Sequence, residues 1–120
     1  MNTVQLTGRL AKDPELRHAN SGTAVANITV AVDRQAKDAP ADFVPITAFG
    51  KVAEAVAQYT TKGYLVSVEG RIQVRSWDTD DGERHWRTEV IANRIEFLKA
   101  PKAKADNAPA IVEDTDVEPF

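Results

Sequence analysis

The stretch that decides the fold covers residues 64–77 and reads YLVSVEGRIQVRSW. Apolar side chains occupy alternate positions on both sides of Gly70, which is the period of a β-strand. These positions are Val66, Val68, Ile72 and Val74. A glycine inside a strand is typical of a sharp bend or of a close approach between backbones. We therefore predict one long strand that coils around a small barrel.

The segments on either side of this strand fit the same sheet. Residues 78–84, DTDDGER, indicate a polar turn, and residues 85–98, HWRTEVIANRIEFL, predict the strand that returns from it. Alternating apolar positions upstream predict three shorter strands, at residues 3–10, 25–33 and 43–50. The turn residues Asn20, Ser21 and Gly22 come before the second of these and predict a hairpin between the first two strands.

One segment has the helical period. In residues 51–63, KVAEAVAQYTTKG, the larger apolar side chains recur at i, i+4 and i+7, and Gly63 is a natural C-terminal stop. Five strands, a helix between strands 3 and 4, and bend glycines in strands 1 and 4 are typical of a small closed barrel of the OB type. The sequence therefore predicts an all-β, five-stranded OB-fold barrel over residues 1–99.

The charge of the chain divides unevenly. Residues 1–99 carry equal numbers of basic and acidic side chains, so residues 100–120 hold the whole net charge of −3. This segment is rich in alanine and proline and has few large apolar residues, so it cannot offset the entropy of ordering itself. We predict a second region at 100–120, a disordered acidic tail. It ends in EDTDVEPF, where a phenylalanine ring lies beside the chain's own carboxylate.

Catalytic and metal sites find little support in the sequence. There is no cysteine, His18 and His85 have no partners at ligand spacing, and the acidic turn at Asp78, Asp80 and Asp81 lacks the rest of a calcium loop. No phosphate loop, nucleophile elbow or membrane span appears either. We expect a cytoplasmic protein that is not an enzyme and needs no metal or cofactor.

Aromatic and cationic side chains occur together on the predicted hairpin. Unpaired bases need flat faces for stacking and cations for the phosphates between them, and this pairing offers both. The hairpin carries Arg75, Trp77, Arg84, Trp86 and Arg87, and the third strand carries Phe43 and Phe49. Phe49 and the tryptophans have an alternative role in the core. Further cations either follow the phosphates or only solubilise the surface: Arg9, Arg17, Arg34, Lys51 and Arg71.

Several segments together resemble the bacterial single-stranded DNA-binding protein family. They read VQLTGRLAKDPELRH, SGTAVANITVAV, FGKVAEAVAQYTTKG, VEGRIQVRSW and TEVIANRIEFL, followed at the C-terminus by Pro-Phe. The resemblance implies a homotetramer around which single-stranded DNA wraps in replication, recombination, repair and the response to DNA damage, in association with the nucleoid. It implies stacking of bases on Phe43, Phe49 and Trp77, and Trp86 falls where the family often has another aromatic residue. A further stacking tryptophan of the family is missing here, near Ala36.

The resemblance also gives the acidic end a role. It implies that the tip docks on replication, recombination and repair proteins through its terminal ring, carboxylate and acids. The docking residues are Glu113, Asp114, Asp116, Glu118, Pro119 and Phe120. Val117 and Glu118 depart from the family's usual ending, and a merely solubilising tail is the alternative for this stretch.

Two other classes of function stay open at this point. An OB-fold module that binds protein or folded RNA would use the same barrel, because a fold does not fix a function. A small hydrolase would use acids such as Asp78 and Glu89.

Overall fold

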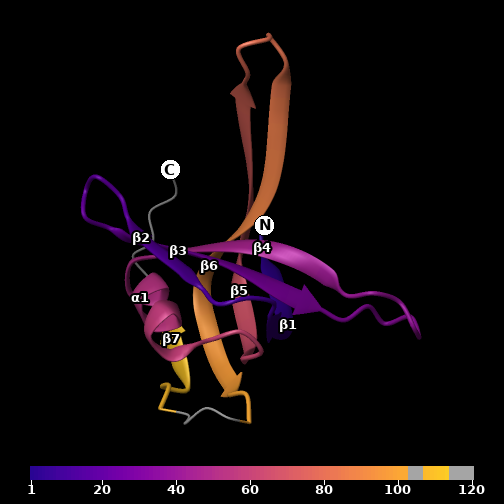
Figure 1. Ribbon diagram of the computed structural model, residues 1–120, viewed down its shortest axis with the longest axis vertical. Coiled ribbons are helices and arrows are strands. Elements are labelled where there is room, and N and C mark those ends of the chain that lie inside the picture. Colours follow the sequence, from indigo (N-terminus) through magenta and orange to yellow (C-terminus); the bar gives the residue numbers. More distant parts are fainter. Residues whose placement is uncertain (103–106, 114–120) are drawn as a thin grey trace.

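Strands make up most of the computed structural model, which describes residues 1–102 and 107–113 (Figure 1). In β1, β3, β4 and the barrel part of β5, alternating apolar positions bury one face of the strand, as the period of two predicts. In chain order the elements are β1 (Val4–Leu10), β2 (Glu15–His18), β3 (Ala24–Val32), β4 (Asp42–Phe49), α1 (Gly50–Tyr59), β5 (Leu65–Asp78), β6 (Arg84–Lys99) and β7 (Ile111–Glu113).

The sheet closes on itself. Its strand order is β1-β5-β6-β4-β3-β2, and β1 also pairs with β3, which joins the two ends of the central five strands. All pairs are antiparallel except β4 with β6, which run parallel. With α1 between β4 and β5, this arrangement confirms the predicted OB-type fold.

Two glycines allow the strands to cross closely. A Cβ on Gly70 would lie 2.0 Å from the carbonyl oxygen of Ile91, and the register of β5 on β6 shifts between Glu69 and Gly70. A Cβ on Gly8 would lie 2.2 Å from the carbonyl oxygen of Ala31 on β3. Both strands therefore bend where only a residue without a side chain fits.

The core lies inside the barrel and under α1. The helix buries Val52, Ala53, Ala55 and Val56 against β3 and β4. No helix in residues 1–102 or 107–113 is long and apolar enough to cross a membrane.

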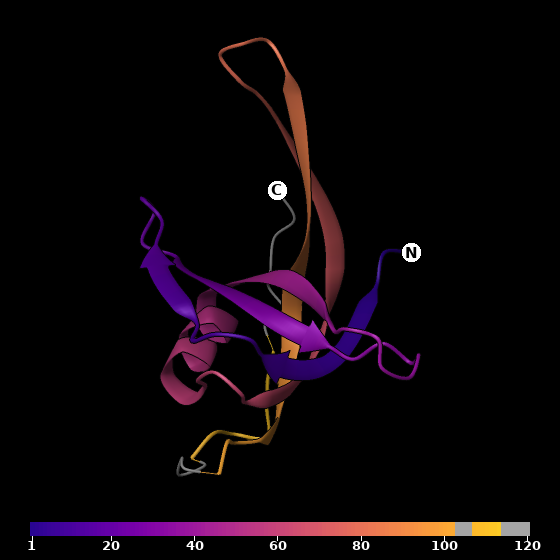
Figure 2. The same ribbon diagram turned by 45° about the vertical axis from the view of Figure 1, so that its right-hand side comes forward.

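The far ends of β5 and β6 leave the barrel as a long two-stranded arm, which Figure 2 shows rising above the sheet. Val66 and Val68 are buried in the barrel, but Ile72 and Val74 are 45% and 57% exposed on the arm. The predicted alternation is present along the whole strand. Its outer half is exposed because no second layer of the described chain covers the arm.

Two strands of the structure were not predicted. β2 pairs with β3 across the turn at residues 19–23, so this turn closes the β2–β3 hairpin and does not join β1 to β3. β7 lies in the segment predicted to be disordered, so that expectation does not hold for residues 111–113. The other predicted docking residues lie outside the described chain: Asp114, Asp116, Glu118, Pro119 and Phe120.

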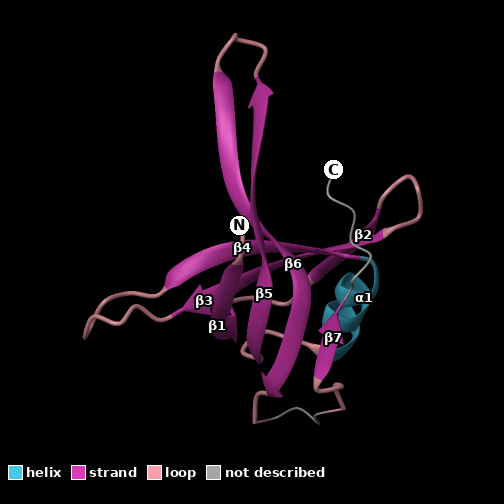
Figure 3. Cartoon of the chain, turned by 180° about the vertical axis from the view of Figure 1, so that it is seen from behind, coloured by secondary structure: helices cyan, strands magenta, loops and turns pink. Residues whose placement is uncertain are grey.

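The edge of β6 explains why β7 forms. β4 pairs only with residues 90–92 of β6, so the next part of that edge is available to β7 at residues 94–96. The Phe97 N–H donates to the carbonyl of Ala110 at 2.9 Å, Val112 packs against the core, and Glu113 lies 3.7 Å from Arg94. β7 lies beside α1, as Figure 3 shows. Tertiary pairing thus orders a segment whose composition does not favour structure.

Candidate nucleic-acid interface

The outer face of β4 presents an exposed aromatic ring. Side chains alternate along β4, so Ile46 and Ala48 point into the core, whereas Phe43, Thr47 and Phe49 belong to the other face. Phe43 is 65% exposed, which excludes a core role for this ring in the described chain. Phe49 is partly buried and lies outside the main core cluster.

The register of the arm sorts its side chains onto two faces. Trp77 lies opposite His85 and Arg75 opposite Arg87, so these four residues share one side, which we call the cationic face. Ser76 lies opposite Trp86, which places Trp86 on the other side. That second side, the apolar face, carries Ile72, Val74 and Trp86. The two predicted tryptophans therefore lie on opposite faces of the arm.

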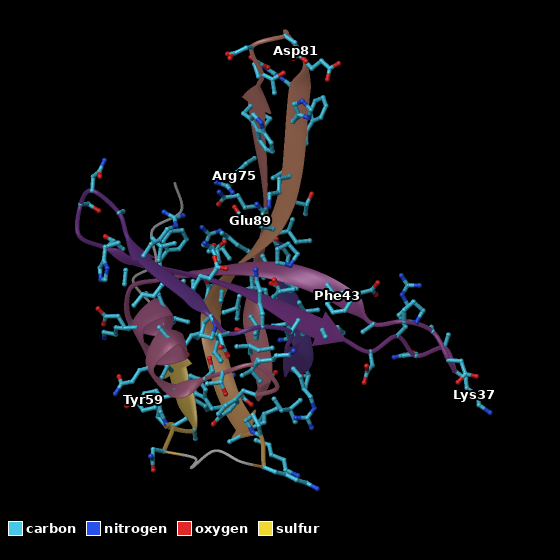
Figure 4. The ribbon with its side chains drawn as sticks, in the orientation of Figure 1. Lys37, Phe43, Tyr59, Arg75, Asp81 and Glu89 are labelled. Atoms are coloured by element: carbon cyan, nitrogen blue, oxygen red, sulfur yellow. The ribbon has the colours of Figure 1, made fainter. Side chains whose placement is uncertain are left out.

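The cationic face continues into the barrel surface at a groove. Figure 4 shows Arg75 and Glu89 at the base of the arm, close to β4. The groove has a volume of about 290 Å³. Its polar lining comes from the β1–β2 connection, β2, β3, β4 and the arm, and includes Lys12, Glu15, Arg17, Asn27, Thr29, Thr47, Arg75, Arg87 and Glu89. A second hollow of about 440 Å³ lies further along the arm and is lined by Arg75, Ser76, Trp77 and Arg87.

A buried carboxylate lies at the base of the groove. Glu89 is 6% exposed, accepts a hydrogen bond from the Thr47 hydroxyl at 2.7 Å, and lies 2.9 Å from the Arg75 Nε. Both of its oxygens are therefore satisfied, and its charge is compensated. The contact joins the arm to β4 and holds the Arg75 guanidinium over the groove. A hydrolase role would need Glu89 to be available for proton transfer. In this geometry both of its oxygens already have partners, Thr47 and Arg75, that hold the arm against β4.

Two guanidinium groups at the groove are available to an anion. Arg17 and Arg87 make no ion pair within residues 1–102 and 107–113. Lys12 lies 3.5 Å from Glu15 in an exposed pair, which water and salt weaken. Arg75 and Arg87 therefore line the hollow beside Trp77, and Lys12 and Arg17 line the adjoining groove.

The other predicted cations are dispersed. Arg9 donates to the carbonyl of Gly63 at 3.0 Å, and Arg84 pairs with Asp78 at 3.0 Å near the turn of the arm. Arg34 donates two hydrogen bonds to Asp42, and they hold the pKa of that carboxyl below its usual value. Lys51 is exposed on α1, and Arg71 has a buried Nη2 with no hydrogen-bond partner in the described chain.

Lys12 and His85 belong to this surface but were not predicted. Lys12 lies in the connection to β2, a strand too short and exposed for its period to be recognised. His85 had a signal in the sequence, because residues two apart on a strand share a face and Arg87 was already a candidate. No group of three or more His, Asp or Glu side chains in the described residues could hold a metal ion.

Comparison with known proteins agrees with the geometry. Residues 1–98 match the model of the single-strand binding protein family. Single-stranded DNA-binding protein 2 of Clostridium acetobutylicum is 52% identical over 103 residues, which cover 82% of this chain and 77% of that protein. Single-stranded DNA-binding protein B of Bacillus subtilis is 46% identical over 109 residues, covering 87% and 96%. The chain belongs to the single-strand binding protein family.

Proposed function

We propose that the protein binds single-stranded DNA without reading its base sequence and protects it. One observation carries the proposal: the half-exposed indole of Trp77 shares a face of the arm with Arg75 and Arg87, and that face leads into a cationic groove. An unpaired base stacks on the ring, and its neighbouring phosphates meet the guanidinium groups. A base inside a duplex is already stacked and paired, so it cannot use the ring.

The proposed path of the strand follows the outer face of the barrel. It begins at Trp77, crosses the groove beneath Arg75 and Arg87, and continues over the outer face of β4, where Phe49 and Phe43 lie at opposite ends of the strand with the groove between them. Trp86 enters this path only when a longer strand passes around the arm to its apolar face. Nothing along the path has to distinguish one base from another, because every base has a stacking face.

A charge substitution tests the phosphate contacts. Arg87→Gln removes a groove cation that has no ion pair in the described residues, so its loss leaves no carboxylate unpaired there. We expect weaker binding to oligo-dT at low salt. We also expect the slope of log affinity against log salt to become shallower by about 0.7, the value for one contact with a single strand.

Lys99→Gln is the matched control. This exposed lysine lies at the end of β6 away from the arm, and its substitution removes the same charge from the chain. The control should leave the slope near the wild-type value. An Arg87→Gln slope equal to that of the control would contradict the proposed path.

We further propose that the acidic tip recruits replication, recombination and repair proteins. Its support is the sequence together with the family resemblance: acids steer the approach to a basic pocket, and the ring of Phe120 follows them. Deleting residues 114–120 should abolish binding to such an enzyme while affinity for oligo-dT stays equal or rises at low salt. This deletion leaves β7 intact, so a clear loss of DNA affinity would argue against a docking role.

Assembly and location complete the proposal. We propose a homotetramer that acts in the cytoplasm in association with the nucleoid, on the basis of the family resemblance. Light scattering after size-exclusion chromatography should give four times the mass of one chain. The mass of a single chain would contradict the tetramer but not the stacking model.

A further inference from the structure

We propose that His85 is a positioning residue of the DNA site, whose ring supports one face of Trp77 and leaves the other face for a base. This inference rests on the proposed function. It concerns a residue that stands outside the aromatic set expected from the family resemblance.

The geometry of the two rings is specific. Trp77 and His85 lie directly opposite each other on β5 and β6. Their ring centroids are 5.9 Å apart and their planes differ by 22°, which is an offset stack. Both side chains are about half exposed. An exposed indole without such a neighbour rotates among rotamers, so the imidazole restricts the ring before any base arrives.

The hollow beside Trp77 indicates where a base can approach the indole. The hollow beside Trp77 is lined by Arg75, Ser76 and Arg87 and does not include His85. The imidazole therefore lies away from the hollow, and a base that enters it meets the indole and the two guanidinium groups. A ring that is already oriented loses less conformational entropy on binding, which raises affinity without a new contact to DNA.

The charges around His85 come from both strands of the arm. Its Nε2 lies 3.7 Å from the Glu83 carboxylate, and Arg75 and Arg87 share its face one pair closer to the barrel. Asp78 and Arg84 form their own pair at 3.0 Å on the opposite face. The stack itself does not need a charged imidazole, so a neutral ring of similar shape should replace it.

Two substitutions separate stacking from other effects of the side chain. His85→Ala removes the ring and should weaken binding to oligo-dT by about threefold to tenfold, the range expected when one more side chain has to be ordered on binding. His85→Phe restores a flat ring and should bring affinity back to within about twofold of wild type. His18→Ala, at the end of β2, is the control for loss of a histidine and should leave affinity unchanged.

The outcomes distinguish this inference from the proposed function. Thermal unfolding first checks that His85→Ala is folded. Wild-type affinity retained by His85→Ala, or a His85→Phe variant as weak as His85→Ala, would overturn the positioning role while single-strand binding stands. Failure of the wild-type protein to bind oligo-dT would overturn the proposed function itself.

Discussion

A Trp77→Ala variant is expected to bind a short oligo-dT about tenfold to a hundredfold more weakly than the wild-type protein. Stacking of one base on an aromatic ring contributes about 1 to 3 kcal/mol, and the structure presents this ring half exposed beside two arginines. The substitution also removes the ring on which His85 stacks. It does not alter the core, because Trp77 lies on the projecting arm.

The matched control for this prediction is Trp86→Ala. Trp86 is 66% exposed on the apolar face of the same arm, so the control removes an equally large ring at a similar distance from the barrel. Fluorescence anisotropy with a labelled oligo-dT of about eight nucleotides compares the two variants within one site size. We expect a much smaller loss for Trp86→Ala. Equal losses of affinity in the two variants would contradict the proposal that a short strand binds on the cationic face and not on the apolar face.

A Gly70→Ala variant is expected to lose most of its stability. The added Cβ would lie 2.0 Å from the carbonyl oxygen of Ile91 and 2.9 Å from its carbon. Both strands are held by pairing on either side of this point, so the backbones cannot separate without breaking part of the ladder. We expect a loss above about 4 kcal/mol in the free energy of unfolding, against a typical total of about 5 to 15.

Gly82→Ala is the control for a glycine in the same hairpin. Gly82 has a φ of 85° in the turn, and a Cβ there would meet nothing within 4 Å. The cost should be only about 1 to 2 kcal/mol, from the left-handed backbone conformation. Urea unfolding followed by circular dichroism measures both variants. Similar midpoints for Gly70→Ala and wild type would contradict the close approach of β5 and β6.

The strands that were predicted could be found because each buries apolar side chains in the barrel. The alternation around Gly70 and the polar turn at residues 78–84 predicted the long hairpin, and the i, i+4, i+7 pattern predicted the helix. β2 was missed because all four of its side chains are exposed and show no period. β7 was missed because a free edge on β6, far away in sequence, creates it. Both depend on tertiary pairing that a local pattern does not contain.

The candidate site was predictable in composition but not in arrangement. Arg75 and Trp77 share a face because they are two residues apart, and the sequence shows this directly. Whether Trp86 or His85 lies across from Trp77 depends on the register that the turn of the arm sets between β5 and β6. A shift of this register by one residue would place a different side chain across from Trp77. The sequence alone therefore predicted the aromatic residues and arginines without separating the two faces.

The most direct test of the central claim is a titration of the intrinsic tryptophan fluorescence with oligo-dT, with duplex DNA of the same length as the control. The account predicts strong quenching by oligo-dT as bases stack on Trp77, affinity that falls as salt rises, and little quenching by the duplex. Absence of quenching by oligo-dT, or equal quenching by the duplex, would contradict it. Either result would favour a module that binds protein or folded RNA on this barrel.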